Sequence, residues 1–260
     1  MTQPLPQRPP QPPLPLPAGR PLVRTRMFSL GLAKIEAATR LRTIALIEGE
    51  PGTGKTTTVR FHAQTTGQQV HVIEIPPDSS SKVSLRHVHR SLTGYYPPGD
   101  KHEIQDLLVR LLGQGGAVVI VDEAQHLGLA GIKQLRYLHD TCGRDAEPFT
   151  LVLSGHGVQR AVGRSRELAD RIKIRHHMTP IPTAQVEDVL RQFHPRLAQA
   201  DLALLLAIDD WAKGNLRRWG SLMELVDEND GATHDVQRDP LDKAAARLAF
   251  RLMGEEGPRL

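Results

Sequence analysis

The sequence predicts an α/β protein in which a parallel sheet of five strands is flanked by helices and followed by a small helical lid. Between residues 29 and 180, short apolar runs alternate with segments of helical periodicity, as in a doubly wound fold. Residues 117–121 are apolar throughout and follow two glycines, which is typical of a strand buried on both faces. Beyond about residue 180 only helical patterns remain, and these predict the lid.

The individual elements follow from the spacing of apolar residues. The predicted strands cover 43–48, 69–75, 117–121, 149–154 and 171–175. The predicted helices of the core cover 29–41, 54–66, 83–93, 101–112 and 130–141, and those of the lid cover 183–193, 199–211, 215–228 and 240–253. The chain is therefore divided into an N-terminal arm (1–28), an α/β core (29–180) and a helical lid with a C-terminal helix (181–260).

The arm differs from the rest of the chain in composition. Residues 1–21 contain nine of the twenty prolines, which predicts a disordered or polyproline II segment. Residues 1–35 carry five basic and no acidic side chains, whereas the other 225 carry 28 basic and 29 acidic ones. A basic arm could lie on nucleic-acid phosphates or on an acidic partner, or it could act only as a solubilising tail.

The composition also indicates the cell compartment in which the protein is expected. Hydrophobic residues make up 39% of the chain, enough for a full core, but none of the apolar runs approaches the roughly 18 residues of a membrane span. The N-terminus has no apolar signal-peptide core, because prolines interrupt its short apolar stretches. The single cysteine, Cys142, excludes an internal disulfide framework. We therefore expect a cytoplasmic protein with no membrane segment.

A glycine-rich loop follows the first predicted strand. It reads Gly49-Glu50-Pro51-Gly52-Thr53-Gly54-Lys55-Thr56, with Thr57 next, and fits the phosphate-binding template of Gly, four residues, Gly, Lys, then Ser or Thr. The glycines let successive N–H groups turn towards phosphate oxygens, and the next helix adds its positive end. Lys55 is expected at the β- and γ-phosphates and the Thr56 hydroxyl at Mg²⁺. The loop predicts an ATP and Mg²⁺ site.

A second motif ends the third predicted strand. Residues 118–123 read VVIVDE, an apolar run followed by two acids. In phosphate-loop NTPases an acid at this place lies near Mg²⁺, so Asp122 is assigned to the metal, directly or through water. Glu123 is then placed to polarise the attacking water as general base. A base next to a phosphate loop predicts hydrolysis in addition to binding.

The motifs GEPGTGKT, VVIVDEAQHL and LVLSGHG, together with a helical tail that carries GNLRR, resemble the AAA+ ATPases. More closely, the chain looks like the branch that holds the phage Mu B protein, the TniB and TnsC transposition ATPases and the ExeA-like secretion ATPases. The phrase DEAQHL, followed by LRYLHD at 135–140, points to this branch. The resemblance covers about residues 29–228 and implies a P-loop NTPase (AAA+) fold.

The resemblance also implies further roles. Sensor 1, a polar residue near the γ-phosphate, falls on His156, with Ser154 as the other candidate. Arg171 looks like the arginine finger supplied to a neighbouring subunit, with Arg164 and Arg166 as competitors. Arg217, in the GNLRR segment, resembles sensor 2 on the lid.

Relatives of the Mu B kind polymerise on duplex DNA in the ATP state and hand a target site to a transposase. The resemblance therefore implies a homo-oligomeric ring or filament that binds duplex DNA without reading its sequence, with Lys82 and Arg86 as candidate phosphate contacts. The expected function is that of a transposition target-selection helper. Two alternatives remain: an ExeA-like ATPase that assists assembly of a secretion or envelope machine, and a nucleotide-gated switch that docks partners through the proline-rich arm.

Overall fold

The computed structural model describes residues 22–145, 147–229 and 239–258, so the proline-rich segment 1–21 lies outside the described residues. The chain divides into two compact units. The first comprises Phe28–Gly49 and Lys55–Met178. The second comprises Thr179 onward, the loop Glu50–Gly54 and the few residues before Phe28.

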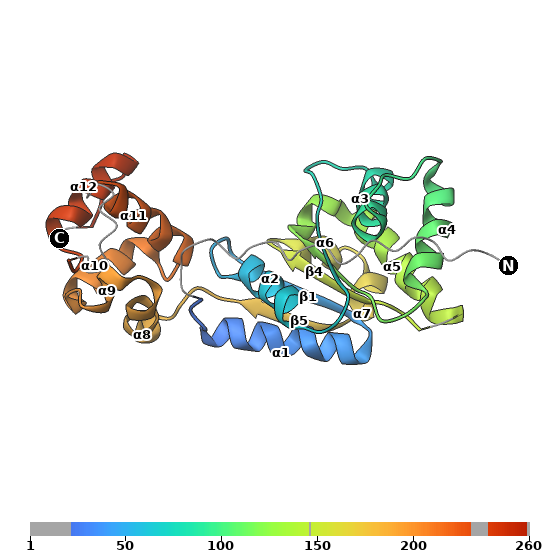
Figure 1. The fold of residues 1–260 in the computed structure, drawn as a ribbon, viewed down its shortest axis with the longest axis horizontal. Coiled ribbons are helices and arrows are strands. Elements are labelled where there is room, and N and C mark those ends of the chain that lie inside the picture. Colours follow the sequence, from blue (N-terminus) through green and yellow to red (C-terminus); the bar gives the residue numbers. More distant parts are fainter. Residues whose placement is uncertain (1–21, 146, 230–238, 259–260) are drawn as a thin grey trace. The chain divides into compact units, whose positions relative to one another are not determined.

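The first unit is built on a five-stranded parallel sheet, as predicted (Figure 1). Its strands are β1 Ile44–Gly49, β2 Val70–Glu74, β3 Val118–Asp122, β4 Thr150–Gly155 and β5 Ile172–Met178. They are arranged in the order β2-β3-β4-β1-β5. β3 and β4 are buried along their whole length, which explains why each contains a continuous apolar run, 118–121 and 151–153, rather than an alternating pattern.

Helices flank this sheet. They are α1 Arg26–Leu41, α2 Lys55–Thr65, α3 Ser81–Thr93, α4 Lys101–Leu112, α5 Gly128–Asp145, α6 Val158–Gly163 and α7 Arg166–Arg171, with a 3-10 turn η1 at Ala124–Leu127. Successive residues of a strand point to opposite faces, so Ile44 and Leu46 of β1 join the apolar cluster of α3, α4 and α5. Ala45 and Ile47 are buried on the other face of the same strand.

In its described residues, the second unit contains helices and loops but no strand. They are α8 Thr183–Phe193, α9 Pro195–Ala198, α10 Leu202–Ala212, α11 Leu216–Asn229 and α12 Lys243–Met253. The helices share one apolar core, in which Trp219 is fully buried. Among the described residues, no helix combines the length and the apolar character that a membrane span requires.

Several boundaries differ from the predicted ones. The first helix begins at Arg26 rather than 29, so residues 26–28 are helical although the sequence pattern places them in the arm. Arg171 ends α7 instead of starting β5, and β5 extends to Met178 through its pairing with β1. The short helices α6 and α7 have no counterpart among the predicted elements, because six residues are too few to show a helical period.

In the second unit, capping residues determine two helix starts. The helix predicted at 199–211 begins at Leu202 as α10, because the Asp201 side chain accepts a hydrogen bond from Ala203 N–H and caps it. The short helix α9 precedes it and was not predicted. The last helix begins at Lys243 rather than 240, because Asp242 accepts from Ala245 N–H.

A buried carboxylate holds the turn between α10 and α11. Asp209 Oδ1 accepts hydrogen bonds from Gly214 N–H at 3.1 Å and from Trp219 Nε1–H at 2.9 Å, and its residue is only 6% exposed. Two buried donors therefore depend on one acceptor, which fixes the turn to the core of the second unit.

We predict that Asp209→Ala lowers the free energy of unfolding by about 3 kcal/mol, because it leaves the buried indole N–H of Trp219 without its acceptor. Urea unfolding followed by tryptophan fluorescence measures this change. The control is Asp210→Ala, which removes the neighbouring exposed carboxylate from its pair with Lys213 and should cost less than about 0.5 kcal/mol. Equal losses in the two variants would contradict the proposed role of Asp209.

Candidate nucleotide site

Three side chains donate hydrogen bonds to three consecutive backbone carbonyls of the glycine-rich loop. Lys55 Nζ donates to Gly49 O at 2.8 Å and Thr53 Oγ1 donates to Glu50 O at 2.8 Å. A third donor, Asn215 Nδ2, lies 2.9 Å from Pro51 O. Gly52 and Gly54 have φ values of 82° and 93°, a region in which glycine is unstrained. The loop therefore has a defined curl between β1 and α2.

Lys55 is the one cation of this motif, and it is 7% exposed. Its ammonium carries three donors, so the bond to Gly49 O leaves it able to donate to a phosphate oxygen as well. The predicted role of Lys55 is compatible with this position.

Asp122 is brought to Ser154 by the register of β3 and β4. Val121 pairs with Leu153, so the next residues, Asp122 and Ser154, are neighbours at the carboxyl ends of adjacent strands. Ser154 Oγ donates to Asp122 Oδ1 at 2.9 Å, and the Thr56 hydroxyl donates to the same carboxylate. The structure thus joins Thr56 and Asp122, the two residues that the sequence assigns to Mg²⁺.

Burial raises the pKa of Asp122, and the charge of Glu123 raises it further, while the hydroxyls of Thr56 and Ser154 oppose the shift. A buried carboxylate with this environment is stabilised by a cation. A hydroxyl and a carboxylate are hard oxygen ligands of the kind Mg²⁺ prefers, and Mg²⁺ commonly takes its remaining ligands from water and phosphates. The described residues contain no group of three or more His, Cys, Asp or Glu side chains that could hold a metal alone.

Glu123 follows Asp122 in a left-handed backbone conformation, with φ 52° and ψ 44°. Such a conformation is uncommon for a residue with a side chain and costs roughly 1 kcal/mol. The Glu123 carboxylate accepts a hydrogen bond from Gln125 Nε2 at 2.6 Å. Gln125 Oε1 in turn accepts from His156 N–H at 3.2 Å. Gln125 therefore connects the candidate base to the end of β4.

Sequence reasoning missed Gln125, although it lies in the DEAQHL phrase two residues after the base. It also missed why the residue before His156 is a glycine. A Cβ at Gly155 would lie 2.3 Å from Gln125 Oε1, so a larger residue would displace the amide.

The two sensor 1 candidates lie in different surroundings. Ser154 is fully buried and bonded to Asp122, as described above. His156 is exposed, and its backbone N–H is the group that contacts Gln125. The geometry thus brings Ser154 into contact with the proposed metal ligand.

The candidate arginines all lie at exposed positions. Arg171 ends α7, with its Nε 3.6 Å from Asp140 Oδ1, while Arg164 follows α6 and Arg166 begins α7. Arg217 is in the first turn of α11, where its backbone N–H donates to Asn215 Oδ1 at 2.9 Å.

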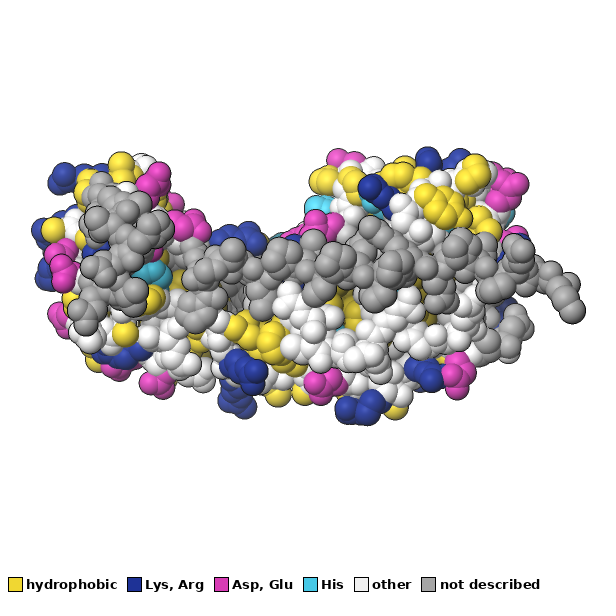
Figure 2. All heavy atoms as spheres, viewed as in Figure 1, with side chains coloured by type: hydrophobic (Ala, Val, Ile, Leu, Met, Phe, Trp, Pro, Cys, Tyr) yellow, Lys and Arg dark blue, Asp and Glu magenta, His cyan; other side chains and the backbone are white. Residues whose placement is uncertain are grey.

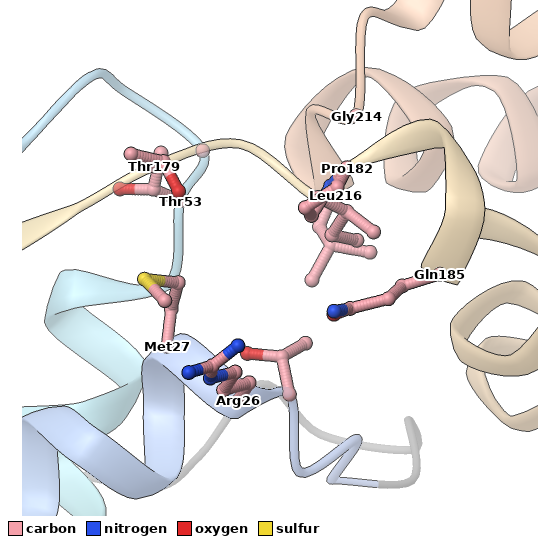
Figure 3. Close-up of a pocket in the computed structure, with 11 residues that line it drawn as sticks. Arg26, Met27, Thr53, Thr179, Pro182, Gln185, Gly214 and Leu216 are labelled. Carbon is pink, nitrogen blue, oxygen red and sulfur yellow. The ribbon is translucent and has the colours of Figure 1, made fainter.

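The second unit contains a pocket that includes part of the glycine-rich loop (Figure 3). The hollow is small, with a cavity volume of about 70 Å³. Its apolar lining comes from Met27, Ile181, Pro182 and Leu216, and Arg26 and Gln185 add polar ends. Gly52 and Thr53 of the loop also line it, so a flat base bound here would be next to the phosphate loop. No local motif could reveal this pocket, because its lining comes from four segments that are distant in the sequence.

Comparison with known proteins agrees with this geometry. Residues 38–161 match a protein family described as an AAA domain. The chain is 31% identical over 158 residues to the general secretion pathway protein A of Aeromonas hydrophila, covering 56% of this chain and 28% of that protein. It is 30% identical over 127 residues to the ATP-dependent target DNA activator B of Escherichia phage Mu, covering 48% of this chain and 40% of that protein.

Among solved structures, the Aeropyrum pernix ORC1 protein in complex with DNA is similar, with a TM-score of 0.64 and 16% identity over 89% of this chain and 66% of that one. The chain therefore has the predicted P-loop AAA+ fold. Its predicted likeness to phage Mu B and to the ExeA-like ATPases is confirmed. The chain spans less than half the length of these curated relatives.

We predict that Asp122→Asn stabilises the metal-free protein at neutral pH. Because the pKa of Asp122 is raised in the folded state, the stability linked to this group is full below 3.8 and is lost as pH rises through the raised value. Asparagine removes the buried charge, so the gain at neutral pH should be on the order of 1 kcal/mol.

Thermal unfolding of both proteins at several pH values measures this gain, and the stability curve of the variant should be flatter above pH 3.8. Asp106→Asn, which changes an exposed carboxylate on α4, is the control and should have little effect. A variant less stable than wild type at neutral pH would show that the hydrogen bonds from the two hydroxyls to the carboxylate outweigh the burial of its charge.

Proposed function

Residues 38–161 match the AAA domain family, and we propose that this chain binds Mg-ATP and hydrolyses it to ADP and phosphate. The observation that carries the proposal is the junction of Thr56, Asp122 and Ser154 at the ends of β3 and β4. It places a hydroxyl of the phosphate loop against a buried acid, with a second acid one residue further on. This is the arrangement expected of a hydrolytic phosphate-loop site.

Each residue then has a role in turnover. The loop N–H groups and Lys55 would bind the phosphates. Thr56 with Asp122 would hold Mg²⁺, which would neutralise phosphate charge. Glu123 orients a water and accepts its proton as the water oxygen attacks the γ-phosphorus and ADP leaves. Ser154 acts as sensor 1, the polar residue near the γ-phosphate. His156 is the alternative for this role. Arg217 contacts the nucleotide from the lid.

We further propose that the protein acts as a homo-oligomer, a ring or filament in the ATP state. An arginine that acts on a neighbouring subunit's nucleotide must lie at the surface. Arg171 satisfies this condition with a side chain that is 59% exposed, while Asp140 restrains its position. Arg164 and Arg166 are exposed as well and remain competitors for the same role.

For the partner of this ATPase, the most informative surface lies on α3 and the loop after it. The Tyr96 hydroxyl accepts a hydrogen bond from Arg90 Nη1 at 2.8 Å, and the guanidinium groups of Arg90 and Arg86 lie 4.7 and 5.3 Å from the Tyr96 ring centre. Tyr95 and Tyr96 are 48% and 38% exposed. Figure 2 shows basic and hydrophobic side chains together over the part of the molecule that holds α3 and α4.

This α3 surface keeps its charges in fixed positions. His87 packs against Tyr96 with its ring centre 5.3 Å away, and burial, followed by the charges of Arg90 and Arg86, lowers its pKa. The arginines therefore provide the positive charge near neutral pH. Lys82, one turn before Arg86, extends the same surface. Cations held beside an exposed aromatic ring suit a nucleic-acid backbone and carry no base reading of their own.

The α3 surface and the likeness to an ATP-dependent target DNA activator together favour a DNA-directed role. We propose that the protein binds duplex DNA non-specifically with ATP and presents it to a transposase as a target-selection helper. The second candidate is assistance to assembly of a secretion or envelope machine, which the match to general secretion pathway protein A favours. These two roles differ in their response to DNA.

We predict that Glu123→Gln binds ATP with nearly wild-type affinity but hydrolyses it at least about 100-fold more slowly, because the amide cannot accept the proton of the water. Phosphate release with and without random-sequence duplex DNA, recorded together with particle size, tests the activity and the DNA role. DNA should raise the wild-type rate, and the variant should form large, stable complexes on DNA only with ATP. If DNA changes neither the rate of phosphate release nor the particle size of wild type, the transposition role is excluded and the secretion role is favoured.

We also predict that replacing both Arg86 and Arg90 with Ala weakens binding to every duplex sequence alike. The dependence of log affinity on log salt should become shallower by about one for each phosphate that the variant no longer neutralises. Fluorescence anisotropy with labelled DNA at several salt concentrations measures this slope. The matched control replaces Lys34 and Arg40, two exposed cations of α1, with Ala and removes the same charge. Equal slopes in the two double variants would show that net charge, and not the α3 surface, binds DNA.

A further inference from the structure

The turn between α10 and α11 is fixed on several sides. Gly214 N–H donates to buried Asp209, and Gly214 O accepts from Ile181 N–H at 3.0 Å. Gly214 has φ 68°, and a Cβ there would lie 2.2 Å from Ile181 O. The residue that follows this turn, Asn215, therefore starts from a backbone position with little freedom.

The Asn215 side chain forms two different kinds of hydrogen bond. Its Oδ1 accepts from Arg217 N–H at 2.9 Å and from Arg218 N–H at 3.3 Å, which caps the N-terminus of α11. Its Nδ2 donates to Pro51 O at 2.9 Å. Because the oxygen meets donors and the nitrogen meets an acceptor, the partners determine the orientation of the amide.

The bond to Pro51 O orients a peptide of the phosphate loop. A trans peptide is planar, so the N–H of Gly52 points away from the side on which the Pro51 carbonyl lies. Pro51 itself has a fixed φ and no N–H, which removes other ways for the loop to turn. Gly52 is required here for a second reason besides its φ of 82°, since a Cβ would lie 1.9 Å from Asn215 Oδ1.

We propose that Asn215 is a positioning residue for nucleotide binding. It holds the Pro51–Gly52 peptide so that the Gly52 N–H is directed away from Asn215, towards the side where phosphate oxygens bind. This proposal rests on the proposed function, because it assumes that the loop takes nucleotide phosphates. Asn215 acts through the loop and needs no contact with the nucleotide, in contrast to the role proposed for Arg217.

The two roles of Asn215 can be separated by substitution. Asn215→Ser and Asn215→Asp both retain a good helix cap for α11. Ser is one bond shorter than the amide and Asp has no N–H, so neither replaces the donor to Pro51 O. Asn215→Ala removes both the cap and the donor, and it reports what the cap contributes to stability. Ser is the main variant, because Asp also adds a negative charge close to the phosphates.

The experiment measures binding of ADP and of a non-hydrolysable ATP analogue to the full chain, and steady-state hydrolysis of ATP. We expect Asn215→Ser to weaken nucleotide binding about tenfold. This is the size of effect expected when one hydrogen bond that positions a binding site for a charged ligand is lost. KM should rise by a similar factor while kcat changes less than about twofold, because Glu123 and Asp122 are untouched. Thermal unfolding of the Ser variant should match wild type, because the cap is kept.

The outcomes distinguish the two proposals. If wild type binds no nucleotide, the proposed function and this inference both fall. If the Ser and Asp variants bind nucleotide as tightly as wild type does, the proposed function stands and the positioning role of Asn215 is refuted. If only Asn215→Ala loses affinity and it also unfolds at a lower temperature, Asn215 is a helix cap and nothing more.

Discussion

The candidate site depends on the parallel pairing of β4 with β3 on one side and with β1 on the other. Parallel strands place their carboxyl ends at one edge of a sheet, about 4.8 Å apart from strand to strand. β1 ends at the phosphate loop, β3 ends at Asp122, and β4 between them ends near Ser154. A shift of one residue in the β3–β4 register would turn the Asp122 side chain to the other face and separate it from Ser154.

The site also holds arrangements that are unfavourable without a ligand. Asp122 is buried with a raised pKa, and Glu123 has a left-handed backbone. Hydroxyl groups and the Gln125 amide offset part of this cost. Strain and buried charge of this kind commonly mark functional sites, because a bound cation or substrate relieves them.

Local patterns are sufficient to predict the sheet, the phosphate loop and the two acids. The strands β3 and β4 contain continuous apolar runs, and the residues of the loop are adjacent in sequence, so each signal lies in one short window. The short helices α6 and α7 and the cap at Asp201 escape such patterns, because six residues or one side chain leave little periodic signal. Gln125, Asn215 and the pocket lined by Met27 and Leu216 escape them for a different reason. Their roles come from contacts between separate residues or segments, such as Asn215 with Pro51, which no single-sequence pattern encodes.

The most direct test of the central claim is a calorimetric titration of Mg-ATP into wild type and into Lys55→Ala. We predict one binding site per wild-type chain, and a loss of affinity of at least about tenfold in the variant, because the buried ammonium is the cation proposed to bind the phosphates. Thermal unfolding in the absence of nucleotide checks that the variant is folded. Equal affinity of the two folded proteins would show that nucleotide does not bind at this loop, and the account of the site would be wrong.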